Sequence, residues 1–254
     1  MTEKETDGVK NKSQGIYLSL IIPAFNEETR IGRSLDRILS FLRSQPYSSE
    51  VIIVDDGSQD RTVELIRERY GNQDGVRICQ QPLNLGKGEA VKQGMLLGSG
   101  EYLFFSDADL SVPIEALPTF LTHLEDRCDI TIGTRQKSGA LIEVHQPFYR
   151  EFMGKIYTSL SNWILGLPIS DFTCGFKGFR REAARELFSR QRLKNWSFDA
   201  EILYLAQLKG YRLQEIPVHW RNDERTKVKL WRDIVNSFLG LIQIRLYDLW
   251  GKYQ

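Results

Sequence analysis

The chain has 254 residues, of which 41% are hydrophobic and 26% are charged, and its 34 Lys and Arg against 33 Asp and Glu leave a net charge of +1. This is the composition of a globular protein with enough apolar material for a core, and it excludes wholesale disorder and a fibrous chain. The near-zero net charge excludes general nucleic-acid binding, which relies on a basic excess to displace counterions from phosphates.

The ends of the chain and its cysteines bear on the compartment. Residues 1–16 are polar and lack the apolar run of a signal peptide, so we expect a disordered leader. No stretch approaches the roughly 20 uninterrupted apolar residues that span a bilayer, which predicts a protein that is soluble or lies on a membrane surface. Three scattered cysteines without a CxxC pair favour a reducing, cytoplasmic location.

From residue 17 onward, short runs of β-branched and aromatic residues alternate with amphipathic helical patterns. This alternation predicts an α/β fold with a mostly parallel sheet and right-handed crossovers. Because the apolar residues come in blocks, we expect strands that are covered on both faces. The expected strands are 17–22, 50–55, 76–81, 101–107 and 129–134, and the helices between them are 30–43, 60–70, 87–97 and 114–126.

The pattern changes after residue 135. We expect a helix near 147–166, a Gly-rich turn at 174–178, helices near 181–189 and 198–209, a strand at 211–217, and a long tail helix from Leu230 to Trp250. Most apolar residues of the tail fall on one side of that helix: Trp231, Ile234, Val235, Phe238, Leu241, Ile242 and Leu249. The simplest interpretation is one domain, residues 17–229, with an amphipathic C-terminal helix, residues 230–254.

Two strand ends carry paired carboxylates. Asp55 and Asp56 follow the second strand and precede Gly57, and such an Asp-Gly pair is as often a simple turn as a site that binds a nucleotide base or ribose. Asp107 and Asp109 follow the fourth strand. Their carboxylate oxygens, supplemented by substrate phosphates, suit Mg²⁺ or Mn²⁺, whereas the alternative is a helix N-terminus that favours acids.

A glycine-rich segment, 84–89, follows the third strand and opens a helix. Backbone amides at such a position suit anions, so Lys87 is either a phosphate ligand or a solvated cation at the helix end. Neither GxGxxG nor GxxxxGK[ST] is present, which gives a dinucleotide oxidoreductase or a P-loop NTPase no support.

The four motifs IIPAFNEE, VDDGS, NLGKG and DAD stand at four successive strand ends, and in this order they resemble the family-two inverting glycosyltransferases of the GT-A fold. The resemblance implies that a nucleotide sugar binds here. It implies a nucleotide pocket lined by Pro23, Ala24, Glu27, Asp55 and Asp56, with Lys87 beside it, and a metal on the diphosphate held by Asp107 and Asp109.

The second half is similar to the polyprenyl-phosphate hexosyltransferases. The segments DFTCGFK at 171–177 and WSFDAE at 196–201 look closest to dolichyl-phosphate β-glucosyltransferases, with dolichyl-phosphate mannose synthases as near relatives. The resemblance implies metal-dependent transfer of a hexose from a nucleoside diphosphate sugar, UDP-glucose being favoured, to a polyprenyl phosphate. GDP-mannose as donor, a carbohydrate hydroxyl as acceptor, and a silent nucleotide-sugar-binding scaffold remain alternatives.

A phosphate acceptor is already anionic near neutral pH, so it needs cations more than a general base. Arg135 and Lys177 are the first candidates and Arg150 is the weaker one, each with a surface ion pair as the alternative. We expect Asp109, Arg135, Lys177 and Asp199 to form the catalytic group. Asp199 or Glu201 would hold sugar hydroxyls or orient the cations, while the alternative for Asp199 is a helix N-cap.

A lipid acceptor requires contact with a membrane. The candidates are the tail helix and residues 152–167, both of which carry aromatic residues suited to the headgroup region, at the cytoplasmic face of a membrane. Basic residues before and within the tail would meet anionic lipid: Arg225, Lys227, Lys229 and Arg232. The alternative is that both helices pack on the core or on a second subunit.

Overall fold

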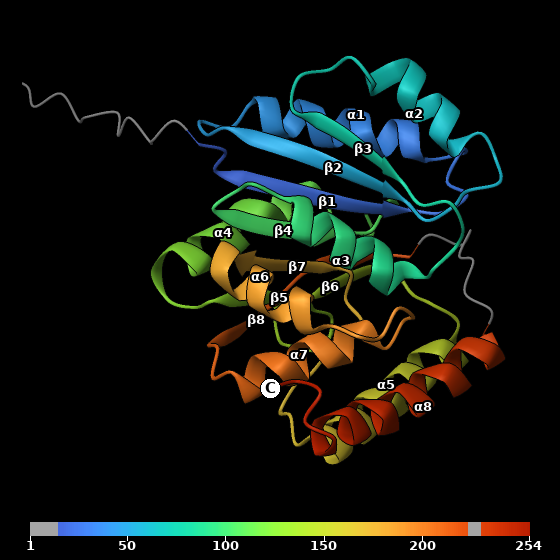
Figure 1. The fold of residues 1–254 in the computed structure, drawn as a ribbon, viewed down its shortest axis with the longest axis vertical. Coiled ribbons are helices and arrows are strands. Elements are labelled where there is room, and N and C mark those ends of the chain that lie inside the picture. Colours follow the sequence, from blue (N-terminus) through green and yellow to red (C-terminus); the bar gives the residue numbers. More distant parts are fainter. Residues whose placement is uncertain (1–14, 223–229) are drawn as a thin grey trace, which may run out of the picture.

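A seven-stranded sheet forms the centre of the computed structural model, which describes residues 15–222 and 230–254, with side chains for 15–222 and 236–254 (Figure 1). The strand order is β3-β2-β1-β4-β7-β5-β8. The strands are β1 (Leu18–Ala24), β2 (Ser49–Asp55), β3 (Val76–Gln80), β4 (Tyr102–Ser106), β5 (Ile130–Thr134), β7 (Phe176–Arg180) and β8 (Leu213–Pro217). Two short strands, β6 (Leu141–Val144) and β9 (His219–Arg221), form a separate parallel pair.

The helices cover both faces of the sheet. They are α1 (Ile31–Arg43), α2 (Thr62–Tyr70), α3 (Lys87–Leu97), α4 (Leu117–Asp126), α5 (Phe148–Leu165), α6 (Arg181–Arg190), α7 (Phe198–Leu208) and α8 (Leu230–Leu249). Alternate residues of β1 point to opposite faces. Leu20 belongs to the core cluster that contains residues of α1, α2 and α4, whereas Ile21 belongs to the cluster with residues of α3, α6 and α7. The expected α/β architecture and its double coverage are therefore confirmed.

The predicted Gly-rich turn at 174–178 is wrong, because β7 begins at Phe176 and runs antiparallel between β4 and β5. Its glycine permits a close approach rather than a turn. A Cβ at Gly178 would overlap the ring of Phe104 on β4. The insertion of β7 separates β4 from β5 in the sheet.

The tail helix is present, and its apolar residues differ in burial. Leu241 and Ile244 are fully buried in the core that contains α7, whereas Ile242 and Leu249 are exposed. Figure 1 shows α8 beside α5, below the sheet. The expected leader up to residue 14 and the basic residues Arg225, Lys227 and Lys229 lie outside the described residues, as do the side chains of Trp231, Arg232, Ile234 and Val235.

Candidate active site

The site lies where β1, β2 and β4 end, because these mutually parallel strands bring their carboxyl ends to one edge of the sheet (Figure 1). Asp107 follows β4, and Lys87 is the first residue of α3. The Lys87 ammonium lies 2.5 Å from Asp107 Oδ1. The structure thus brings together an acid and a base that are predicted from two separate strand ends.

Asp109 belongs to a chain of alternating charges. Its Oδ1 accepts a hydrogen bond from the backbone NH of Ser111 at 2.9 Å, and its Oδ2 lies 3.8 Å from Nη1 of Arg30. Arg30 in turn donates to both carboxylate oxygens of Glu27. Glu27 therefore acts on the site through Arg30, a residue the sequence reasoning missed, although its spacing of three from Glu27 was a readable signal.

The two acids after β4 fit a divalent cation. Burial, followed by the charge of Asp107, raises the pKa of Asp109, because two nearby carboxylates disfavour each other's ionisation. A cation would relieve that repulsion. Within the described residues no group of three or more His, Cys, Asp or Glu is arranged around a metal position. One or two carboxylates with substrate oxygens are the usual ligand set of Mg²⁺.

Of the residues expected to line the nucleotide pocket, Asp55 has a side-chain oxygen that is unpaired within the described residues, whereas Pro23 and Ala24 are buried strand residues. Asp55 is fully buried, and its Oδ2 accepts from the backbone NH of Ser58 at 3.0 Å, while its Oδ1 has no hydrogen-bond partner in the described part of the chain. Buried acceptors are rarely left unpaired, so Asp55 can accept a hydrogen bond from a ligand. Pro23 and Ala24 are buried in β1 and contribute through the backbone: the Ala24 carbonyl accepts from the Asp56 NH at 2.8 Å.

Asp56 holds the glycine-rich loop in place. Its carboxylate accepts from the backbone NH of Leu85 at 2.7 Å and of Gly86 at 3.0 Å. Burial raises the pKa of Asp56, and these two amide donors oppose that shift. Asp56 thus positions the segment that carries Lys87, and its expected contact with a nucleotide stays a prediction.

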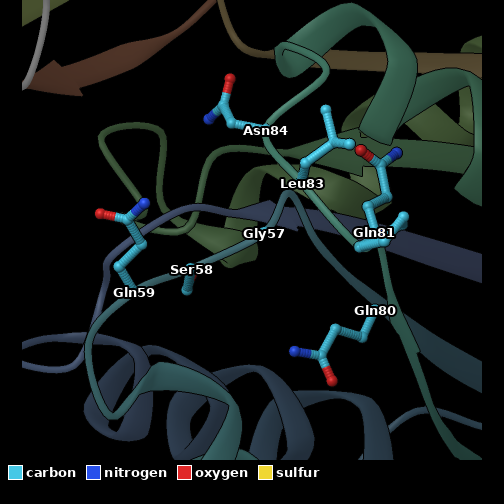
Figure 2. Close-up of a pocket in the computed structure, with 8 residues that line it drawn as sticks. Gly57, Ser58, Gln59, Gln80, Gln81, Leu83 and Asn84 are labelled. Carbon is cyan, nitrogen blue, oxygen red and sulfur yellow. The ribbon is translucent and has the colours of Figure 1, made fainter.

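A cavity of about 430 Å³ lies between the loops that follow β2 and β3 (Figure 2). Its volume falls in the range of small-molecule sites. Gly57 adopts φ 71°, and a Cβ there would come within 2.5 Å of the Leu83 carbonyl carbon, so the two loops approach each other only because this position is glycine. The lining residues are Gly57, Ser58, Gln59, Gln80, Gln81, Pro82, Leu83 and Asn84, most of which the sequence reasoning did not single out.

Arg135, which directly follows β5, forms an internal ion pair with Asp171. Its guanidinium donates to the two carboxylate oxygens of Asp171 at 2.7 and 2.9 Å and to the Thr173 hydroxyl at 2.8 Å. Burial alone would raise the pKa of Asp171, but the charge and hydrogen bonds of Arg135 outweigh it and the pKa is lowered. The alternative of an ion pair thus describes Arg135 in this structure, although the pair is buried rather than superficial.

Lys177 does not face solvent. Its side chain is 1% exposed, and its ammonium donates to the Phe172 and Cys174 carbonyls at 3.0 and 2.7 Å and to Asp199 at 2.5 Å. An ammonium has three protons, so this set accounts for all of them. In this structure Lys177 is thus paired with Asp199 inside the protein, and its expected contact with the acceptor phosphate stays a prediction.

The two acids of α7 occupy different surroundings. Asp199 stands in the first turn of α7 without a side-chain cap bond, so the N-cap alternative is wrong. Burial raises its pKa while the charges of Lys177 and Lys87 oppose that rise. Glu201 is fully buried and accepts from the backbone NH groups of Arg192 and Leu193 and from the Tyr253 hydroxyl. Glu201 is thus hydrogen-bonded to groups inside the protein.

Comparison with known proteins identifies the group to which this site belongs. The family model described as glycosyl transferase family 2 matches residues 19–188, which include every strand-end motif described above. The chain belongs to glycosyltransferase family 2. The resemblance stated from the motifs is confirmed, and the chain is a glycosyltransferase.

Individual relatives agree over nearly the whole chain. The dolichyl-phosphate β-glucosyltransferase of Drosophila melanogaster is 36% identical over 95% of this chain and 76% of the relative, and that of Homo sapiens is 32% identical over 93% and 77%. Among solved structures, the glucosyl-3-phosphoglycerate synthase of Mycobacterium tuberculosis in complex with UDP covers 91% of this chain and 80% of its own at a TM-score of 0.67. At 20% identity this likeness confirms the GT-A fold alone.

Arg150, in the first turn of α5, is the third cation expected in this family 2 enzyme. Its guanidinium Nε is buried without a hydrogen-bond partner in the part of the chain that the structure describes. Trp196, by contrast, was not proposed for any role, yet its ring lies 4.9 Å from the Lys87 ammonium and is 41% exposed. The WSFDAE motif pointed to this segment without indicating that its tryptophan covers the lysine.

Proposed function

We propose that this glycosyltransferase transfers glucose from UDP-glucose to dolichyl phosphate or a related polyprenyl phosphate. The similarity over more than nine-tenths of the chain to several dolichyl-phosphate β-glucosyltransferases carries the proposal. The site supports it with the parts that this reaction requires: paired acids beside a lysine at a strand end, a buried carboxylate with a free acceptor oxygen, and a cavity next to it.

Asp107 and Asp109 would hold Mg²⁺ or Mn²⁺, and the cation would neutralise the charge that grows on the leaving diphosphate. The fit of the acids to a cation supports this assignment, as does the presence of Mn²⁺ and UDP in a solved structure of the mycobacterial synthase. Lys87, now paired with Asp107, is the cation of this chain that would bind the diphosphate oxygens.

The nucleoside would bind at the ends of β2 and β3. Asp55 would accept a hydrogen bond from the base or the ribose through its unpaired Oδ1. The cavity beside Ser58 would receive the remainder of the nucleoside. Asp56, Pro23, Ala24 and Glu27 would shape this site through the backbone, the loop and Arg30, rather than through direct contact.

The acceptor phosphate attacks the anomeric carbon as an anion, so no side chain has to remove a proton. Of the three expected cations, Arg150 is the one whose buried Nε has no partner, and we assign the acceptor phosphate to it. Arg135 and Asp199 would not contact the acceptor; through their ion pairs with Asp171 and Lys177 they would keep the neighbouring loops in position. Attack opposite the leaving diphosphate would turn an α-linked donor into a β-linked lipid-phosphate sugar.

A lipid acceptor requires a membrane, and no helix within the described residues is long and apolar enough to cross one. We propose that residues 17–229 form the catalytic domain, and that the outer faces of α5 and α8 lie on the membrane surface. Large apolar side chains are exposed on both helices: Phe148, Tyr149, Phe152 and Trp163 on α5, and Leu239, Ile242 and Leu249 on α8, with Trp250 directly after it. Aromatic rings of this kind suit the headgroup region.

The decisive experiment incubates the protein with Mg²⁺ or Mn²⁺, a panel of labelled nucleotide sugars and polyprenyl phosphate, followed by organic extraction. We expect label from UDP-glucose to enter the organic phase, and anomeric coupling in the NMR spectrum of the product to show a β linkage. Label only from GDP-mannose would assign the mannose alternative. Label only in a water-soluble carbohydrate would replace the lipid acceptor by a hydroxyl acceptor, and an α linkage would contradict in-line displacement.

A further inference from the structure

The loop that carries Lys87 is built against a segment more than 100 residues further along the chain. The carbonyl of Lys194 accepts hydrogen bonds from the backbone NH groups of Gly88 at 2.7 Å and Glu89 at 3.3 Å. The contact is too close for a side chain: a Cβ at Gly88 would lie 2.8 Å from the Lys194 carbonyl oxygen and 2.9 Å from that of Leu193. The position of Lys87 therefore depends on the position of residues 191–195.

Residues 191–195 are in turn held by Glu201. This carboxylate is fully buried, and it accepts from the backbone NH of Arg192 at 3.0 Å and of Leu193 at 2.8 Å. A buried carboxylate is stable only when its oxygens are hydrogen-bonded, so these bonds constrain the segment strongly. The connection from Glu201 to the α3 N-terminus passes through two successive sets of backbone hydrogen bonds.

The turn after α8 completes this arrangement. The Tyr253 hydroxyl donates to Glu201 Oε1 at 2.6 Å, and the Arg192 guanidinium donates to the Lys252 carbonyl at 2.8 and 3.1 Å. Tyr253 is only 2% exposed, although it lies in the turn that follows the half-exposed helix. The same helix packs against the start of α7, where a Cβ at Gly240 would overlap the Ser197 hydroxyl.

We propose that Tyr253 and Glu201 are positioning residues for the donor diphosphate: together they hold residues 191–195 against the α3 N-terminus and so keep Lys87 beside Asp107. This inference rests on the proposed function, because it takes Lys87 as the ligand of the diphosphate. It also connects α8, the helix assigned above to the membrane surface, with the binding of the nucleotide sugar.

The test compares the binding of two probes, UDP with Mg²⁺ and uridine alone, by titration calorimetry. Tyr253→Phe removes one hydroxyl and retains the ring. We expect it to weaken UDP binding by roughly three- to ten-fold, the effect of one typical intramolecular hydrogen bond, and to leave uridine binding unchanged. Tyr247→Phe is the matched control, because it removes a phenol hydroxyl from α8 that is not bonded to Glu201. It should bind both probes like the wild type.

A double-mutant cycle separates positioning of Lys87 from a general loosening of the fold. In a Lys87→Met background, Tyr253→Phe should weaken UDP binding no further, because the side chain that it positions is gone. Glu201→Gln, which keeps the size but removes the charge, should weaken UDP binding in the same direction as Tyr253→Phe. The melting temperature of every variant is recorded alongside.

The outcomes distinguish this inference from the proposed function. If Lys87→Met weakens UDP binding but Tyr253→Phe does not, the inference is overturned while the proposed function stands. Equal weakening of UDP and uridine, or full additivity in the cycle, would also overturn it, because both indicate a general structural effect. A wild type that binds no UDP would overturn the proposed function, and the inference with it.

Discussion

The two acids that follow β4, Asp107 and Asp109, have different charged partners. Asp107 is paired with Lys87, whereas Asp109 lies close to Arg30 and has a raised pKa caused first by burial and then by the charge of Asp107. Their side chains are 34% and 20% exposed, so neither is an essential part of the core. Their proposed role in catalysis can therefore be tested separately from the stability of the fold.

Asp107→Asn and Asp109→Asn should each lower the rate of sugar transfer by about 100-fold or more, the usual effect of removing one group that stabilises transition-state charge. The melting temperature should change little, because both residues retain solvent contact. Asp126→Asn, at the exposed end of α4, is the matched control and should leave the rate unchanged. Measured transfer at the wild-type rate in both variants would contradict the metal assignment.

The Arg135–Asp171 pair predicts a pH dependence of stability. The pKa of Asp171 is lowered from its ordinary 3.8, so the pair stabilises the folded state above that pH and loses its effect as pH falls through the lowered value. Asp171→Asn should cost about 3–5 kcal/mol near neutral pH, because it leaves the Arg135 charge buried without its partner. The free energy of unfolding of the variant should also fall less steeply than that of the wild type as the pH is lowered below about 4, measured by urea unfolding at a series of pH values. An acid profile parallel to that of the wild type would contradict the role of this pair.

The start of α3 depends on a distant part of the chain. Gly86 adopts φ 107°, and a Cβ there would lie 2.5 Å from the Lys194 carbonyl oxygen. No side chain fits this geometry without moving the loop. The glycines of the NLGKG motif are thus required by a contact with residues 193–195 as well as by any anion.

Gly86→Ala should destabilise the protein by about 1–3 kcal/mol, since it combines an unfavourable φ with a steric overlap. Gly154→Ala is the control: it lies inside α5, and no atom lies within 4 Å of the place that its Cβ would take, so it should be neutral or stabilising by up to about 1 kcal/mol. Urea unfolding of both variants measures the difference. Equal effects at the two positions would mean that the contact with Lys194 does not constrain the loop.

For the molecule as a whole, the exposed apolar residues concentrate on α5 and on α8 with its following turn. Trp163 is 81% exposed and Leu249 is 73% exposed, far more than a core-facing helix requires. Two helices that pack against each other and both leave large apolar groups in contact with water form a surface suited to an interface.

Trp163→Glu and Leu249→Glu should each reduce sedimentation with vesicles of phosphatidylcholine and phosphatidylserine, by roughly ten-fold in binding constant, because each replaces an exposed apolar group of the proposed membrane surface by a charge. Leu208→Glu, at an exposed leucine at the end of α7, should leave sedimentation unchanged. If all three variants sediment like the wild type, the two helices do not form the membrane contact.

Much of this architecture is readable from local pattern. The expected strands 50–55 and 129–134 agree with β2 and β5 to within one residue at each end, because a buried strand is marked by its own run of β-branched residues and the turn that follows. The motifs at four strand ends were sufficient to indicate the family, since they lie in consecutive turns whose spacing the alternation of strands and helices sets.

The local sequence pattern does not predict which acidic residues pair with Lys177 and Arg135. Lys177 binds Asp199, 22 residues away, and Arg135 binds Asp171, 36 residues away, so a sequence shows each as a free cation. The antiparallel β7 lies between β4 and β5 and brings these groups into contact. This packing requires glycine at 178 and 175, because a Cβ there would overlap Phe104 and Asp107, respectively. Hydrophobic period and turn chemistry are properties of neighbouring residues, whereas charge pairing in a low-dielectric interior arises only when distant segments pack together.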